Sequence, residues 1–246
     1  MVCQVRLCVL NRSTKKLAKQ KRRREHGICA LCEKESKLTL EHVPPKSLFP
    51  SPRPTPLPIY TCDDCNGGSS KLDEKLKVLV GLAAKSSNTI RTDMLWEDVR
   101  RTMAYNKRLS REILSTLRTV DYSTPTGVYL GTGYEVETDR RELDPLILKM
   151  AKCLHYHHFG FVIPETATEL VTWNISQEFL SWIQPDLIGG FVGAKEHFAY
   201  GYNISSEYAE DNQKYGSAFQ FIFYQRCAVT VFFVSNDVEQ DAGSQH

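Results

Sequence analysis

Two pairs of cysteines constrain the folding of this 246-residue chain more than any other feature. Cys29 and Cys32 form one C-x2-C pair, and Cys62 and Cys65 form the second. Four thiolates at this spacing match the ligand set of a tetrahedral structural zinc site. A redox-active C-x-x-C is the competing interpretation of either pair alone, but the presence of two pairs favours metal binding. We therefore predict one Zn2+ held by all four sulfur atoms.

Three polar residues accompany the cysteine pairs. A short strand is predicted over residues 37–40, where leucines alternate with polar residues, and it places Glu41 and His42 at its end. Asn66 directly follows the last cysteine. A carboxylate and an amide oxygen suit a hard divalent cation, and a histidine can accept a proton from water near neutral pH. Together they provide the groups that metal-assisted cleavage of a phosphodiester requires.

The local signals around these residues predict the order strand, loop, strand, helix. Seven of the chain's eleven prolines lie between residues 44 and 58, so this segment is expected to be an extended loop. A second strand is predicted over residues 58–61. Two glycines then permit a tight turn, and the S-x-x-D pattern of Ser70 and Asp73 predicts a capped helix with leucines at helical spacing.

The combined motifs resemble those of the HNH endonucleases, also called ββα-metal or His-Me finger nucleases, in their zinc-bound form. The resemblance covers roughly residues 29–74 and rests on Cys29-x2-Cys32, Glu41-His42-Val43-Pro44 and Cys62-x2-Cys65-Asn66. It implies that Glu41 and Asn66 bind a catalytic Mg2+ or Mn2+. It also implies that His42 is the general base of phosphodiester hydrolysis.

Two departures from the family pattern concern the metal ligands. Glu41 stands where the family more often has aspartate, which keeps the charge but lengthens the side chain by one methylene group. Residues 65–71 contain no histidine, although many members of the family place a ligand a few residues into the helix. Asp73 is a possible substitute for that ligand.

Positive charge is concentrated at the start of the chain. Residues 1–27 contain nine basic residues against the single acidic Glu25, although the whole chain has a net charge of only +2. Such a segment binds a phosphate backbone through counterion release, or it is simply a solvated surface helix or arm. Its position before the first cysteine pair favours nucleic acid. The predicted phosphate contacts are Arg22, Arg23, Arg24, Lys46 and Lys71, of which the two lysines could equally face solvent.

The rest of the chain predicts further helices and strands. Helices are expected over residues 92–105, 108–120, 146–159 and 175–183, with Gly160 ending the third. Extended segments are expected over residues 128–136, 169–173, 197–202, 218–224 and 228–234, the last two forming a hairpin. Residues 237–246 are expected to be a loose tail. His155, His157 and His158, near a helix end, and the phenylalanines of the last two strands are assigned to structure rather than to binding.

These segments give an α+β fold, in which a zinc-bound ββα-metal (HNH) module precedes helices and a mixed α+β C-terminal region. The predicted divisions are a basic N-terminal arm (residues 1–27), the nuclease module (28–84), a helical connector (85–120) and the C-terminal region (121–246).

The predicted activity is metal-dependent endonuclease cleavage of nucleic acid, with DNA preferred over RNA. One alternative is a non-catalytic zinc ribbon that binds nucleic acid through the basic arm, in which Glu41, His42 and Asn66 would not converge. Another is a protein-interaction module whose acidic C-terminal half is the functional part. The sequence leaves the oligomeric state open.

The sequence also bears on location. No apolar run approaches the roughly 20 residues that span a bilayer, so no membrane association is expected. The apolar-leaning segment Val2–Leu10 is interrupted by Gln4 and Arg6, and basic residues follow it rather than precede it, unlike a secretory signal. We expect an intracellular protein of the cytoplasm.

Overall fold

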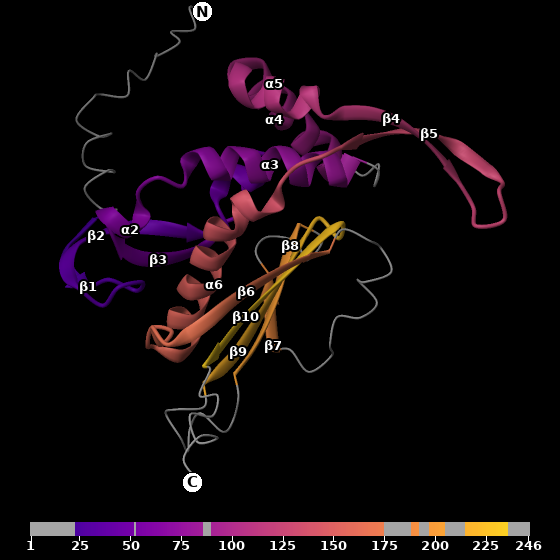
Figure 1. The fold of residues 1–246 in the computed structure, drawn as a ribbon. Helices are drawn as coiled ribbons and strands as arrows, with labels where there is room; N and C mark the ends of the chain where they lie inside the picture. The colour runs from indigo at the N-terminus through magenta and orange to yellow at the C-terminus, as the bar shows by residue number, and fades with distance from the viewer. Residues whose placement is uncertain are drawn as a thin grey trace, which may run out of the picture.

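The computed structural model describes residues 23–51, 53–85, 90–174, 188–191, 197–204 and 215–235. Within these ranges the chain is a mixed α+β protein whose sheets are antiparallel, in agreement with the predicted class. A three-stranded sheet and a five-stranded sheet lie on either side of helix α6, and a two-stranded hairpin extends away from both (Figure 1). Among the described residues, no helix has the length and apolar character needed to cross a membrane.

The small sheet has the strand order β1-β2-β3. Its strands are β1 (Arg23–Ile28), β2 (Glu35–Val43) and β3 (Leu57–Cys62). The predicted strands over 37–40 and 58–61 are therefore confirmed, and β2 continues through Glu41 and His42, which pair with Ile59 and Pro58 of β3. The last residues of the predicted basic arm (1–27) belong to this sheet, because the backbone from Arg23 onward pairs with β2.

A short 3-10 helix, η1 (Lys46–Leu48), lies in the proline-rich loop, and two helices follow β3: α2 (Asp63–Asn66) and α3 (Ser70–Ala84). The turn between α2 and α3 contains Gly68 at a φ of 84°, a left-handed conformation that favours glycine. The predicted cap by Ser70 is wrong. Ser69 occupies the N-cap position without a side-chain capping bond, and Asp73 instead lines a cavity described below.

Two helices, α4 (Ile90–Tyr105) and α5 (Lys107–Ser115), connect the small sheet to the rest of the chain. Asn106 caps α5 by accepting a 3.0 Å hydrogen bond from the Leu109 amide. The predicted helix over 108–120 is wrong beyond residue 115. Strand β4 (Leu117–Ser123) begins there because its β-branched and aromatic residues pair with β5 (Tyr129–Val136). The helical connector thus ends before residue 120.

The β4–β5 hairpin contributes little to the core. Its strands pair only with each other among the described strands, and it projects from the body of the molecule (Figure 1). Several large side chains on it are exposed to solvent, namely Leu117, Tyr122, Val128, Tyr129, Leu130 and Tyr134.

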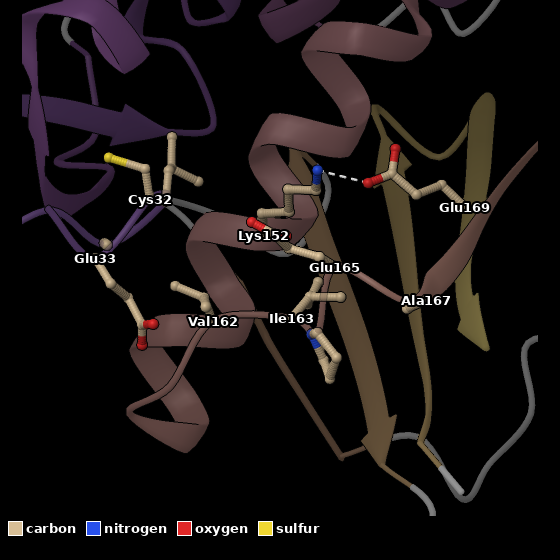
Figure 2. Close-up of a pocket in the computed structure, with 11 residues that line it drawn as sticks. Cys32, Glu33, Lys152, Val162, Ile163, Glu165, Ala167 and Glu169 are labelled. Atoms are coloured by element: carbon tan, nitrogen blue, oxygen red, sulfur yellow. Dashed lines mark ion pairs between the residues drawn. The ribbon is translucent and has the colours of Figure 1, made fainter. Parts of the chain in front are cut away.

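Helix α6 (Asp144–Phe159) follows the 3-10 helix η3 (Arg140–Leu143) and ends at Gly160, which adopts the predicted terminating role with a φ of 78°. The helix packs against β2 on one side and against strands of the large sheet on the other. Near its middle, Lys152 forms a 2.5 Å ion pair with Glu169 of the large sheet (Figure 2). Helix α6 therefore connects the two halves of the molecule.

The large sheet has the order β6-β10-β9-β8-β7. Its strands confirm the extended segments predicted near residues 169–173, 197–202, 218–224 and 228–234, and the last two form the expected hairpin. The predicted helix over 175–183, the tail at 237–246 and Arg22 lie outside the described residues. The strands are β6 (Ala167–Asn174), β7 (Ile188–Phe191), β8 (Phe198–Ile204), β9 (Gly216–Phe223) and β10 (Cys227–Ser235).

A single cluster of buried residues runs through both halves. It includes Val43 and Phe49 near the small sheet, Leu76 of α3, and Phe219 and Phe233 of the large sheet. Phe219, Phe221, Phe223 and Phe233 are thus core residues, as predicted, but the prediction is wrong for Phe232, whose side chain is exposed on β10. The division into a nuclease module and a C-terminal region remains a prediction, but packing joins the two.

Candidate functional site

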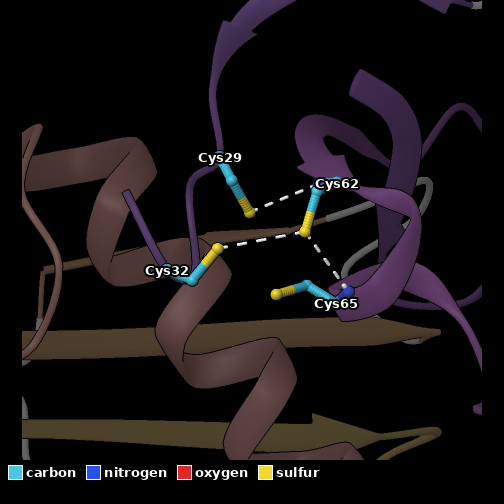
Figure 3. Close-up of side chains that lie close together, drawn as sticks. All are labelled: Cys29, Cys32, Cys62 and Cys65. Atoms are coloured by element: carbon cyan, nitrogen blue, oxygen red, sulfur yellow. Dashed lines mark hydrogen bonds between the residues drawn. The ribbon is translucent and has the colours of Figure 1, made fainter. Parts of the chain in front are cut away.

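The four cysteines of the two pairs meet at one point (Figure 3). Cys29 and Cys32 lie in the turn after β1, Cys62 ends β3 and Cys65 lies in α2. Their sulfur atoms all lie within 4.8 Å of one another, and those of Cys32 and Cys62 are 3.9 Å apart. A tetrahedral zinc ion with bonds of about 2.3 Å requires sulfur atoms about 3.8 Å apart. The cluster therefore has the dimensions of a four-cysteine site for a metal such as zinc, and its cysteines are free thiols.

Backbone amides stabilise negative charge on one sulfur atom of this cluster. The amides of Cys62 and Leu31 donate hydrogen bonds of 3.3 Å and 3.4 Å to the sulfur of Cys29. Burial acts to raise the pKa of Cys29, but these two amides, together with the backbone and thiol of Cys32, outweigh it and lower the pKa to about 7. Burial and the neighbouring sulfur atoms raise the pKa of Cys65. One thiolate forms readily without a metal, whereas several together need a cation to balance their charge.

Beside the cysteine cluster, the predicted polar residues line one cavity of about 360 Å3. Glu41 and His42 reach it from the end of β2, and Asn66 reaches it from the end of α2. All three residues therefore line the same cavity, whereas the non-catalytic zinc ribbon predicts that they do not converge. The remaining lining residues are Leu40, Pro45, Lys46, Ser47, Gly68, Ser69, Ser70 and Asp73.

A hydrogen-bond relay fixes the orientation of the Asn66 side chain. Its Nδ2 donates a 2.8 Å hydrogen bond to Oγ1 of Thr39, and that hydroxyl donates in turn to the carbonyl oxygen of Thr61 at 3.2 Å. Because the amide nitrogen is used on the β2 side, the amide oxygen is left for a ligand. Both threonines lie on paired strands, so the sheet itself sets this orientation.

Asp73 brings a second carboxylate to the cavity. Burial, and then the negative charge of Glu41, raise the pKa of Asp73 to about 6. Within the described part of the chain, its buried Oδ1 has no hydrogen-bond partner. Two carboxylates at one cavity and an unsatisfied oxygen are features that a bound cation would stabilise.

Sequence reasoning missed Lys149, whose ammonium contacts one of these carboxylates. Its Nζ lies 2.6 Å from Oε2 of Glu41, and both side chains are largely buried. The ammonium also donates to the backbone carbonyl of Asn66 at 3.3 Å and to the hydroxyl of Ser69 at 3.4 Å. Lys149 lies on α6, far along the chain, and a lysine in an amphipathic helix carries no signal of this contact.

The predicted phosphate-binding residues divide into three groups. Lys46 lines the cavity and is half-buried, whereas Lys71 is exposed on α3 and does not line it. Arg23 and Arg24 belong to β1, but their side chains lie outside the described part, as does all of Arg22. His155 is fully buried, in agreement with its predicted structural role.

No family model, curated protein or solved structure matches the chain.

Proposed function

We propose that the protein is a metal-dependent endonuclease of the HNH type that hydrolyses phosphodiester bonds in nucleic acid, with DNA preferred over RNA. The observation that carries this proposal is the convergence of Glu41, His42 and Asn66 on one cavity beside the four-cysteine cluster. Paired cysteines of this kind suit a reducing compartment, which supports action in the cytoplasm.

The cavity suits a hard divalent cation. Glu41, Asp73 and the amide of Asn66 offer oxygen atoms, and one carboxylate oxygen of Asp73 is buried without a hydrogen bond among the described residues. Mg2+ and Mn2+ prefer such oxygen ligands and retain several water molecules. In this proposal Glu41 and Asn66 hold the catalytic cation, and Asp73 takes the place of the histidine that the motif lacks.

The side chains then have separate roles in hydrolysis. The cation, when bound, stabilises negative charge on the scissile phosphate and on the departing oxygen. His42 accepts the proton from the attacking water, a role suited to the ordinary histidine pKa of about 6.5. Lys46, the first residue of η1, lines the cavity and contacts a phosphate oxygen of the substrate.

The zinc and the basic residues serve the same site indirectly. A zinc ion at the four cysteines joins the turn after β1 to the end of β3 and to α2, and so fixes Asn66 relative to β2. Lys71 and the basic residues before the first cysteine pair, including Arg22, Arg23 and Arg24, add salt-sensitive affinity for the phosphate backbone.

The test is cleavage of plasmid and single-stranded DNA by zinc-loaded protein with and without Mg2+ or Mn2+. Omission of the cation is preferable to a chelator, because a chelator also removes zinc. We expect cutting by the wild type and by His157→Ala, an exposed histidine on α6, but not by folded His42→Ala. Equal cutting by His42→Ala would contradict the proposal. Salt-sensitive binding without any cutting would favour the non-catalytic zinc ribbon.

A further inference from the structure

The ammonium of Lys149 lies in surroundings that resemble those of a bound metal ion. Its neighbours are a carboxylate oxygen of Glu41 at 2.6 Å, the backbone carbonyl oxygen of Asn66 at 3.3 Å and the hydroxyl of Ser69 at 3.4 Å. The side chain of Lys149 is 14% exposed and that of Glu41 is 12% exposed. All three partners are oxygen atoms, and such a set suits hard cations.

We infer that Lys149 is a built-in competitor of the divalent cation, whose ammonium pairs with Glu41 in the metal-free protein and leaves it when the metal binds. The inference rests on the proposed function, because it takes Glu41 as a metal ligand. It adds a regulatory role for Lys149, whose ammonium lowers the affinity of the cavity for the divalent cation.

Electrostatic repulsion prevents the Lys149 ammonium and a divalent cation from binding Glu41 at the same time. An ammonium in contact with Glu41 would lie within a few ångströms of a dication bound to the same carboxylate, and like charges at that distance repel strongly in a largely buried site. The lysine side chain is flexible, whereas Glu41 is held in a paired strand. Binding of the metal is therefore expected to displace the ammonium and leave the glutamate in place.

The position of Lys149 assigns a role to the C-terminal half of the chain. Lys149 belongs to α6, and α6 packs on β6 and β10 of the large sheet. Any event that shifts α6 relative to β2 changes how tightly the ammonium holds Glu41. Metal affinity at the cavity is thus coupled to the packing of residues outside the motif region.

The first test is titration of zinc-loaded protein with Mn2+. Binding is measured by calorimetry or by the paramagnetic resonance signal of free Mn2+. Lys149→Met should bind Mn2+ at least about tenfold more tightly than the wild type, because a competing charge is removed. Lys149→Arg, which keeps the charge, should not show this increase. Lys152→Met is the matched control, because Lys152 lies on the same helix and pairs with Glu169 instead (Figure 2); its Mn2+ affinity should equal that of the wild type.

The second test needs no variant. Acylation of lysine amines in the wild type, measured by mass spectrometry, should become faster at Lys149 when Mn2+ is added and should stay constant at Lys152. Mn2+ affinity that is unchanged or weaker in Lys149→Met, or acylation unaffected by Mn2+, would overturn the inference. If metal-dependent cleavage persists in that case, the proposed nuclease stands. Absence of Mn2+ binding in every protein tested would overturn both.

Discussion

The indole Nε1 of Trp173 donates a 2.8 Å hydrogen bond to Oδ1 of Asp144. Trp173 lies in β6 and Asp144 begins α6, so this bond fastens the first turn of the helix to the edge of the large sheet. A carboxylate in the first turn also interacts favourably with the helix dipole. The contact therefore helps to hold in place the helix that carries Lys149.

Replacing Trp173 with phenylalanine should lower the free energy of unfolding by about 1–2 kcal/mol, because a hydrogen bond to a charged acceptor is lost. Urea denaturation measures the change. A double-mutant cycle with Asp144→Ala isolates the contact, since the effects of the two substitutions should not add. Simple additivity would show that the bond does not contribute to stability.

Removal of zinc should unfold the small sheet and, because one core joins it to the large sheet, the rest of the described structure with it. Structural zinc contributes about 10–16 kcal/mol of apparent binding free energy in small modules, comparable to or larger than the total stability of a typical domain, about 5–15 kcal/mol. We expect one zinc per chain by elemental analysis, and loss of both the zinc and the cooperative thermal transition in Cys62→Ser. Cys227→Ala, at a buried free cysteine of β10 outside the cluster, should retain its zinc. A cooperative transition in zinc-free protein would contradict a structural role.

Asp73→Asn tests whether the second carboxylate is a metal ligand. Loss of its charge should weaken Mn2+ binding about tenfold while the fold is kept, because ligand charge sets the affinity for hard cations. The control is Glu74→Gln, the next residue on α3, whose carboxylate accepts a hydrogen bond from Asn106. If the two variants bind Mn2+ equally well, Asp73 is not a ligand.

His155 should make stability depend on pH. Its ring is fully buried, its Nδ1 lies 2.9 Å from the carbonyl oxygen of Phe161, and burial lowers its pKa from 6.5 to about 4. Below pH 6.5 the unfolded chain takes up a proton that the folded protein excludes, so stability is present above that pH and is lost as the pH falls. From neutral pH to about pH 5 the loss is about 2 kcal/mol.

The variant His155→Phe isolates this effect. Both proteins share any acid sensitivity of the cysteine cluster, so the informative quantity is the difference in their free energies of unfolding at each pH. That difference should shift in favour of the variant as the pH falls below 6.5. A difference that is constant with pH would show that His155 does not titrate as expected.

Local patterns in the sequence were sufficient for much of the fold. The alternation around Phe219 and Phe221 predicted β9, and the stop at Gly160 predicted the end of α6. The spacing of the cysteine pairs also predicted their convergence, because a tetrahedral ligand set leaves few other arrangements. In each case the information lies within a few residues or in a defined pair of motifs.

Features that depend on distant pairing were not predictable in this way. Residues 117–120 continue a pattern compatible with helix, and only the partner strand β5 makes them extended. Residues 23–27 were expected to form a charged arm, but β2 supplies the backbone partners that make a strand. Lys149 reaches Glu41 only because α6 packs on β2, and no local sequence pattern predicts that packing.

The core that the small and large sheets share limits how the motif region could be moved between proteins. Phe49 is buried in the same cluster as the large sheet, and the hydroxyl of Tyr224 donates a 2.8 Å hydrogen bond to the backbone carbonyl of Leu48. A graft of residues 28–84 onto another scaffold would expose this apolar surface and leave Lys149 behind. The motif region therefore cannot be transferred alone. Substitutions on the surface that packs against α6 and the large sheet must be matched by substitutions in those elements.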